Sequence, residues 1–145
     1  MGFDFGTKRI GVAAGQALTQ TAQGIATINN LGKNGPWSDI EKLIREWRPD
    51  VLVVGLPLGK EGSETEMSRA ARRFGSALGK RFQLPVDFID ETLTSRSAEA
   101  RLSEGTLVGK RVIDKRENLR DLIAAELILE TYLNEYSRRS HVSRD

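Results

Sequence analysis

The chain has 145 residues and a net charge of +2, with 39% hydrophobic and 29% charged residues, which is typical of one globular domain with its own core. It has no cysteine, and its one histidine, His141, lies in a polar C-terminal stretch. These counts exclude a disulfide framework, a positioned catalytic triad and a typical zinc site. A bound metal would therefore be held by carboxylates, which suit Mg²⁺ or Mn²⁺.

Membrane association is also not expected. No apolar run approaches the ~20 residues that a membrane span needs. The first apolar stretch is interrupted by Asp4, Lys8 and Arg9, so it does not have the pattern of a signal peptide. Together with the absence of cysteine, this favours a cytoplasmic protein.

The first fourteen residues predict a β-hairpin with an acid on its first strand. Asp4 lies between Phe3 and Phe5 in a run that otherwise has the pattern of a buried strand. Aspartate is rare in strands, and burying a carboxylate is costly unless a cation compensates it. The segment from Gly6 to Arg9 predicts a turn, and residues 10–14 predict the second strand.

The middle of the chain alternates strands and helices. The expected elements are a strand over residues 24–28, a helix from Ser38 to Arg48, a strand over 51–55, a helix ending at Phe82 and a strand over 86–89. Two capping boxes are expected to start the helices, one from Ser38 to Glu41 and one from Ser63 to Glu66.

The C-terminal third predicts two more helices separated by a basic loop. A short helix is expected from Thr94 or Ser95 to Ser103, and a long one from an Asn118 cap to Tyr136. We interpret residues 1–137 as a single α/β domain with strand and helix order βββαβαβα, plus the short helix before the last. Residues 138–145 are predicted to be a polar, flexible tail. A three-stranded meander followed by two crossover strands predicts a five-stranded mixed sheet flanked by helices.

Acidic residues recur at the ends of these elements. Asp4 is on the first strand, Asp90 and Glu91 follow the fifth, and Asp121 opens the last helix. Carboxylates that converge repel one another unless a cation neutralises them, and carboxylate-held metal ions are suited to phosphoryl chemistry. Strand alternation places Asp90 and Glu91 on opposite faces, so only one of them is expected to bind the metal. The alternative is that Asp121 serves the helix dipole and that Asp90 or Glu91 simply ends a strand.

Basic residues gather in two segments. Residues 67–86 contain five cations and no acid, namely Arg69, Arg72, Arg73, Lys80 and Arg81. Residues 108–120 contain a second group. Such clusters attract phosphate backbones, although a solvated helix face is an equally good interpretation of each. The segment from Gly55 to Glu61 is one residue short of a phosphate-binding loop, and Glu61 replaces its hydroxyl residue.

Four motifs together resemble the YqgF/RuvX family. They are Gly2-x-Asp4-x-Gly6-x-Lys8-Arg9-Ile10-Gly11-Val12-Ala13, Val53-Val54-Gly55-Leu56-Pro57-Leu58, Asp90-Glu91, and Asp121-x-x-Ala124-Ala125. The resemblance covers residues 2–136. It implies an RNase H-like fold related to Holliday-junction resolvases, and a bacterial nuclease of the cytoplasm that processes the 5′ end of precursor 16S ribosomal RNA.

The resemblance also assigns roles to individual residues. Asp4, Glu91 and Asp121 are implied to be the catalytic acids that bind the metal. Phosphate contacts are expected from Lys8 and Arg9 near the site. Arg72 and Arg73 are expected to bind nucleic acid as members of the basic segment, independently of the resemblance. Asp90 is expected to orient a ligand or a water, with Thr94 as a second supporting residue. The family usually has an arginine directly after the Asp-Glu pair, and this chain has Thr92 there. Arg96 is the candidate to supply the missing positive charge.

Four functions compete at this point. The first is a metal-dependent nuclease on structured RNA. The second is a Holliday-junction resolvase on branched DNA. Resolving a four-way junction would favour a symmetric homodimer. The third is a catalytically silent nucleic-acid-binding module, which would not need the three acids together. The fourth, an ATP-binding domain of the actin and sugar-kinase type, needs two such domains and therefore a far longer chain.

Overall fold

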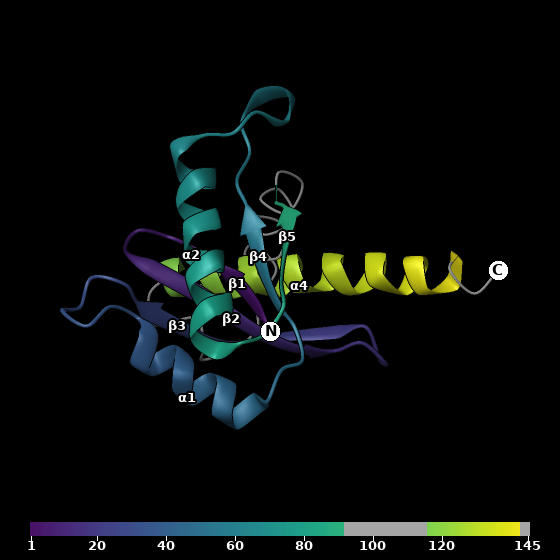
Figure 1. Cartoon of the computed structure of the whole chain (residues 1–145), viewed down its shortest axis with the longest axis horizontal. Helices are drawn as coiled ribbons and strands as arrows, with labels where there is room; N and C mark the ends of the chain where they lie inside the picture. Colours follow the sequence, from purple (N-terminus) through teal and green to yellow (C-terminus); the bar gives the residue numbers. More distant parts are fainter. Residues whose placement is uncertain (92–115, 143–145) are drawn as a thin grey trace.

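A computed structural model of the chain describes residues 1–91 and 116–142. Within these residues, five strands form one mixed sheet in the order β3-β2-β1-β4-β5 (Figure 1). The strands are β1 (Gly2–Asp4), β2 (Arg9–Gln16), β3 (Thr21–Asn29), β4 (Leu52–Leu56) and β5 (Val86–Asp90). β1, β2 and β3 are antiparallel, whereas β4 runs parallel to β1 and β5 parallel to β4. The predicted sheet is confirmed.

Helices cover both faces of the sheet (Figure 1). α1 (Trp37–Trp47) and α2 (Glu66–Phe82) pack on one face, where Phe3, Ile40 and Phe74 share a buried cluster. α4 (Arg116–Val142) packs on the other face, where Ile128 and Leu129 join Val53 in a second cluster. A short 3-10 helix, η1 (Lys60–Gly62), lies between β4 and α2. No helix in the described ranges is long and apolar enough to cross a membrane.

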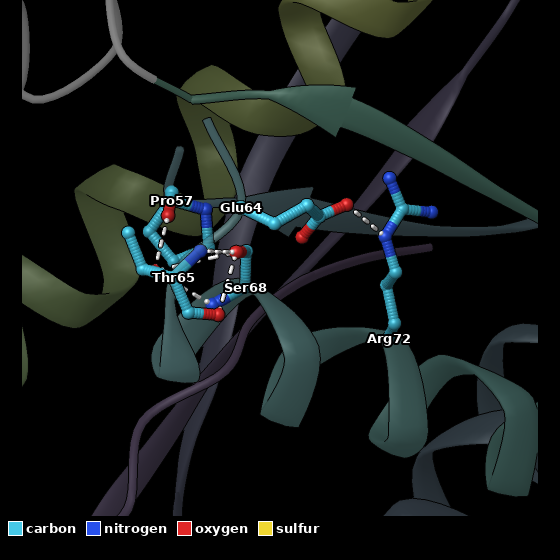
Figure 2. A network of polar contacts seen from close by, with 5 residues as sticks. All are labelled: Pro57, Glu64, Thr65, Ser68 and Arg72. Atoms are coloured by element: carbon cyan, nitrogen blue, oxygen red, sulfur yellow. Dashed lines mark hydrogen bonds and ion pairs between the residues drawn. The ribbon is translucent and has the colours of Figure 1, made fainter. Parts of the chain in front are cut away.

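Both predicted capping boxes are wrong. α1 begins at Trp37, after Pro36 and without a side-chain cap. α2 is capped by Thr65 rather than Ser63: the Ser68 backbone N–H donates to Thr65 Oγ1 at 3.1 Å, and the Thr65 backbone N–H donates to Ser68 Oγ at 2.5 Å. Figure 2 shows this network, in which the Thr65 hydroxyl also donates to the Pro57 carbonyl. Ser63 is part of the preceding turn, because its carbonyl accepts from the backbone N–H of Gly59.

Several predicted elements are shorter than the observed ones. β2 and β3 extend beyond residues 10–14 and 24–28, because their polar ends still pair, as Gln16 does with Thr21. The last helix already includes Arg116 and continues to Val142, so Asn118 is not its cap and Tyr136 is not its end. Residues 138–142 of the predicted tail are helical, and the predicted boundary at residue 137 falls inside α4. The predicted short helix ending at Ser103 and the basic loop before Arg116 lie outside the described residues.

Candidate functional site

Asp4 ends β1 on the sheet face that α4 covers. Its neighbour Phe3 is fully buried in the cluster under α1 and α2, and side chains alternate along a strand. Asp4 is paired in register with Gly11 of β2, which places its carboxyl beside the point where α4 approaches the sheet. The predicted acid of the first strand therefore faces the last helix.

Glu91, rather than Asp90, reaches the same place. Ile89 belongs to the cluster under α4, and alternation puts Glu91 on that face and Asp90 on the other. Asp90 is exposed, whereas Glu91 Oε2 lies so close to Gly55 that a Cβ there would be 2.5 Å from it. The backbone N–H of Glu91 donates to the Leu56 carbonyl at 3.1 Å, which fixes the chain just after β5.

Asp121 is brought to the site by the close packing of α4 on β2. A Cβ at Gly11 would lie 2.1 Å from the backbone oxygen of Asp121, so only glycine permits this approach. Two hydrogen bonds hold the same part of the helix to β3. Thr27 Oγ1 donates to the Asn118 carbonyl at 3.2 Å, and the Gly24 backbone N–H donates to Glu126 Oε2 at 3.0 Å.

The electrostatics show that the three acids act on one another. Burial raises the pKa of Asp4 well above its usual range, and the charges of Glu91 and Asp121 raise it further. Burial, with the nearby charge of Asp90, raises the pKa of Glu91 to about 6, against a hydrogen bond with Asp4 that lowers it. Asp4 and Glu91 therefore hold a proton more strongly than isolated carboxylates do, as expected for acids in one confined site.

Arg9 compensates the third acid. Its Nε donates to Asp121 Oδ2 at 2.8 Å, and the two side chains are 34% and 17% exposed. Arg9 opens β2 and was predicted to contact phosphate, whereas the structure pairs it with a predicted metal ligand. Lys8, the other predicted phosphate contact, is exposed at the tip of the hairpin.

The donor chemistry of the site fits a hard divalent cation. Carboxylate oxygens are the preferred ligands of Mg²⁺ and Mn²⁺, and the mutual repulsion of Asp4, Glu91 and Asp121 is what a bound cation would relieve. Among the described residues, no three acids or histidines are grouped closely enough to hold one ion as they stand. Asp121 is turned toward Arg9, so its carboxylate would have to give up this contact in order to bind a metal.

The other predicted site residues lie elsewhere. Arg72 and Arg73 are exposed on α2, which covers the sheet face opposite the acids. Thr94 and Arg96 lie outside the described residues. Sequence reasoning did not find the Arg9–Asp121 pair or the close approaches at Gly11 and Gly55. Gly11 and Gly55 both belong to the sequence motifs, and their presence there was the signal for these close approaches.

Comparison with known proteins gives the site a family context. The model of the RuvX family, described as Holliday junction resolvase, matches residues 1–135. The chain belongs to the RuvX family. The acids of this RuvX chain lie within the matched region, as do Gly11 and Gly55.

Curated relatives match the RuvX chain over nearly its whole length. One from Aeromonas salmonicida (strain A449), named "Putative pre-16S rRNA nuclease", is 50% identical over 135 residues, 93% of this chain and 94% of the relative. Another with the same name, from Burkholderia ambifaria (strain MC40-6), is 44% identical over 141 residues, 97% of this chain and 92% of the relative.

Solved structures share the fold of the RuvX chain. T. thermophilus RuvC in complex with a Holliday junction substrate has a TM-score of 0.56 at 16% identity, covering 94% of this chain and 93% of RuvC. A Fowlpox virus resolvase in complex with Holliday junction DNA has a TM-score of 0.57 at 12% identity, covering 93% of this chain and 96% of the resolvase. The fold is RNase H-like, as the sequence motifs implied.

Proposed function

We propose that the protein is a divalent-metal-dependent nuclease that hydrolyses phosphodiester bonds in structured RNA, with the precursor of 16S ribosomal RNA as substrate. The observation that carries this proposal is the convergence of Asp4, Glu91 and Asp121, from three separate elements, at one edge of the sheet. The names of two relatives, 50% and 44% identical to this chain, support the choice of substrate. A cytoplasmic location follows from that substrate.

The metal ligands in this proposal are Asp4, Glu91 and Asp121. A bound Mg²⁺ or Mn²⁺ supplies activation of water and neutralisation of charge on the phosphate. A bound cation would favour the ionised forms of Asp4 and Glu91, because an adjacent positive charge stabilises carboxylates. Asp90 stays at the exposed margin, where it can orient a ligand or a water. Lys8 contacts phosphate from the hairpin tip.

Arg9 has a different role in the metal-loaded protein. If Asp121 bound the cation, the guanidinium of Arg9 would contact a phosphate oxygen beside the site instead of the Asp121 carboxylate. Arginine suits this role because its planar donors match phosphate. The predicted phosphate contact is thus retained in the proposal, but only after an exchange of partners.

Resolution of Holliday junctions is the second candidate function. It is favoured by the description of the matching family and by a fold shared with two resolvases that were solved with junction DNA. Such a resolvase would act as a homodimer, because a four-way junction is symmetric. The same three acids would serve either substrate, so the site alone does not choose between RNA and DNA.

One experiment tests both functions. The protein is incubated with precursor 16S rRNA and with a four-way DNA junction, each in Mg²⁺, Mn²⁺ or EDTA. The matched variants are Asp4→Asn in the site and Asp39→Asn on the exposed surface of α1. We expect metal-dependent cleavage of the RNA by the parent protein and by Asp39→Asn, and none by Asp4→Asn.

The other outcomes are equally informative. Cleavage of the junction alone would replace the RNA substrate with branched DNA. Cleavage by Asp4→Asn at the parent rate would refute the assigned site. Binding of RNA without cleavage in any metal would support the catalytically silent nucleic-acid-binding module instead of the nuclease.

A further inference from the structure

A groove of about 450 Å³ lies between α2 and β5, on the sheet face opposite the acids. Its floor is apolar and includes Val86 and Phe88, and its rim carries Arg72 and Lys80. Gly75 also lines it, and a Cβ there would lie 2.5 Å from the Phe88 ring. The helix therefore lies directly on the edge strand, and the groove follows the line where the two meet.

Two cations and one hydroxyl are regularly spaced along the rim. Arg72, Ser76 and Lys80 are spaced four residues apart on α2, so they form one row about 12 Å long. All three line the groove, and Arg69 and Arg73 do not. The row offers two positive charges with a hydroxyl between them, above an apolar floor.

Arg72 shows how an anion binds on this rim. Its guanidinium lies 5.5 Å from the centre of the Phe88 ring. Its Nε donates to Glu64 Oε1 at 2.6 Å, a contact drawn in Figure 2. Glu64 and Arg72 are 39% and 49% exposed, and an ion pair so exposed contributes little to stability. A phosphate oxygen can therefore take the place of the Glu64 carboxylate at little cost.

We propose that this groove binds a single strand of the RNA substrate. A cationic track beside an aromatic floor is how proteins bind single-stranded nucleic acid, with phosphates on the cations and bases on the apolar surface. The groove follows β5, and Glu91 lies one residue beyond the end of that strand. A strand that leaves the acids past the edge of β5 therefore enters the groove. This inference rests on the proposed nuclease function, to which it adds a second substrate contact.

The test measures binding of a labelled oligouridylate by fluorescence anisotropy, in EDTA and on an Asp4→Asn background so that nothing is cleaved. Removing both rim charges, Arg72→Ala with Lys80→Ala, is expected to raise Kd at least about fivefold and to reduce the salt slope by about 1 to 2. The control, Lys42→Ala with Arg45→Ala on α1, removes the same charge elsewhere and is expected to leave Kd within about twofold.

Three single variants at two positions test the groove without removing cations. Ser76→Asp places an acid in the middle of the row and is expected to weaken binding, whereas Ser76→Asn, of nearly the same shape, is not. Glu64→Gln removes the competing carboxylate and is expected to tighten binding roughly threefold. All these positions are exposed, and thermal unfolding checks that each variant is folded.

Each result separates this inference from the proposed function. Equal losses in the rim pair and the α1 pair, or equal Kd for Ser76→Asp and Ser76→Asn, would overturn the groove even if the parent protein cleaves RNA. Loss of oligouridylate binding in the rim pair, with no cleavage by the parent protein in any metal, would support the groove and refute the nuclease.

Displacement of the oligouridylate by an oligoglutamate peptide at equal concentration would assign the groove to an acidic protein segment and overturn the inference. The Kd of an oligothymidylate probe, compared with that of the oligouridylate, shows whether the groove distinguishes RNA from DNA strands.

Discussion

Arg9 and Asp121 lie 112 residues apart in the chain, yet they form the one ion pair that the described residues place at the site. The pair matters because Asp121 is both a proposed metal ligand and the acid that Arg9 neutralises. A metal that recruits Asp121 must break this contact. Arg9 would therefore oppose the proposed metal binding, and its positive charge compensates the negative charge of Asp121.

Replacing Arg9 should expose this competition. We expect Arg9→Ala to lower the free energy of unfolding in EDTA by about 1 kcal/mol, because an ion pair and its compensation of the acids are lost. The increase in Tm on adding Mn²⁺ should be larger than in the parent protein, because no ion pair has to be broken. Arg45→Ala, which removes an exposed pair with Glu41 of the same 2.8 Å length, is the control. An Mn²⁺ response in Arg9→Ala no larger than in Arg45→Ala would contradict this account.

The raised pKa values of Asp4 and Glu91 couple stability to pH in the metal-free protein. Both pKa values are raised in the fold, that of Glu91 from 4.5 to about 6. The stabilisation is fully present below the unfolded values and is lost as the pH rises through the folded ones. Relative to the parent protein, Asp4→Asn should be more stable at about pH 8 than at about pH 5, by on the order of 2 kcal/mol. Urea unfolding in EDTA measures the difference, and a difference that does not change with pH would disprove the coupling.

Secondary-structure elements set the geometry of the site through glycine. At Gly11 the last helix approaches β2 so closely that a Cβ would meet the Asp121 backbone oxygen at 2.1 Å. A backbone contact of this kind cannot be relieved by rotating a side chain. The position of Asp121 therefore depends on a residue of another element that carries no functional group.

We expect Gly11→Ala to displace the start of α4. The predicted loss is about 2 to 4 kcal/mol of stability, together with loss of the Mn²⁺-dependent increase in Tm, because Asp121 leaves the other acids. Gly32→Ala is the matched control, since a Cβ at Gly32 meets nothing within 4 Å. If Gly11→Ala retained the stability of Gly32→Ala, the proposed close approach would be refuted.

The cap of α2 gives a prediction at the same scale. Thr65→Ala should destabilise the protein by about 1 kcal/mol, because Thr65 Oγ1 accepts from the Ser68 backbone N–H. Ser63→Ala should change stability by no more than about 0.5 kcal/mol, because its hydroxyl does not cap the helix. Equilibrium unfolding of the two variants discriminates the observed cap from the one expected from sequence.

At the scale of the whole molecule, much of the architecture could be predicted from the sequence. Apolar patterning located the five strands, and strand alternation separated Glu91 from Asp90 by face. The helix caps were wrong because several polar residues near Ser63 and Thr65 can serve as caps, and tertiary contacts decide which one does. The Arg9–Asp121 pair could not be predicted, because it depends on the register of α4 against β2. That register is fixed by close packing at Gly11, a contact that sequence periodicity does not encode.

The position of Asp121 on α4 has a consequence for the protein during its synthesis. Asp4 is synthesised well before Asp121 and the apolar residues of α4 that complete the second core cluster. A nascent chain that has not yet released α4 has an unfinished sheet face and an incomplete set of acids. The nuclease activity proposed for the protein would therefore begin only once α4 has folded onto the sheet, because this helix brings Asp121 to the other acids.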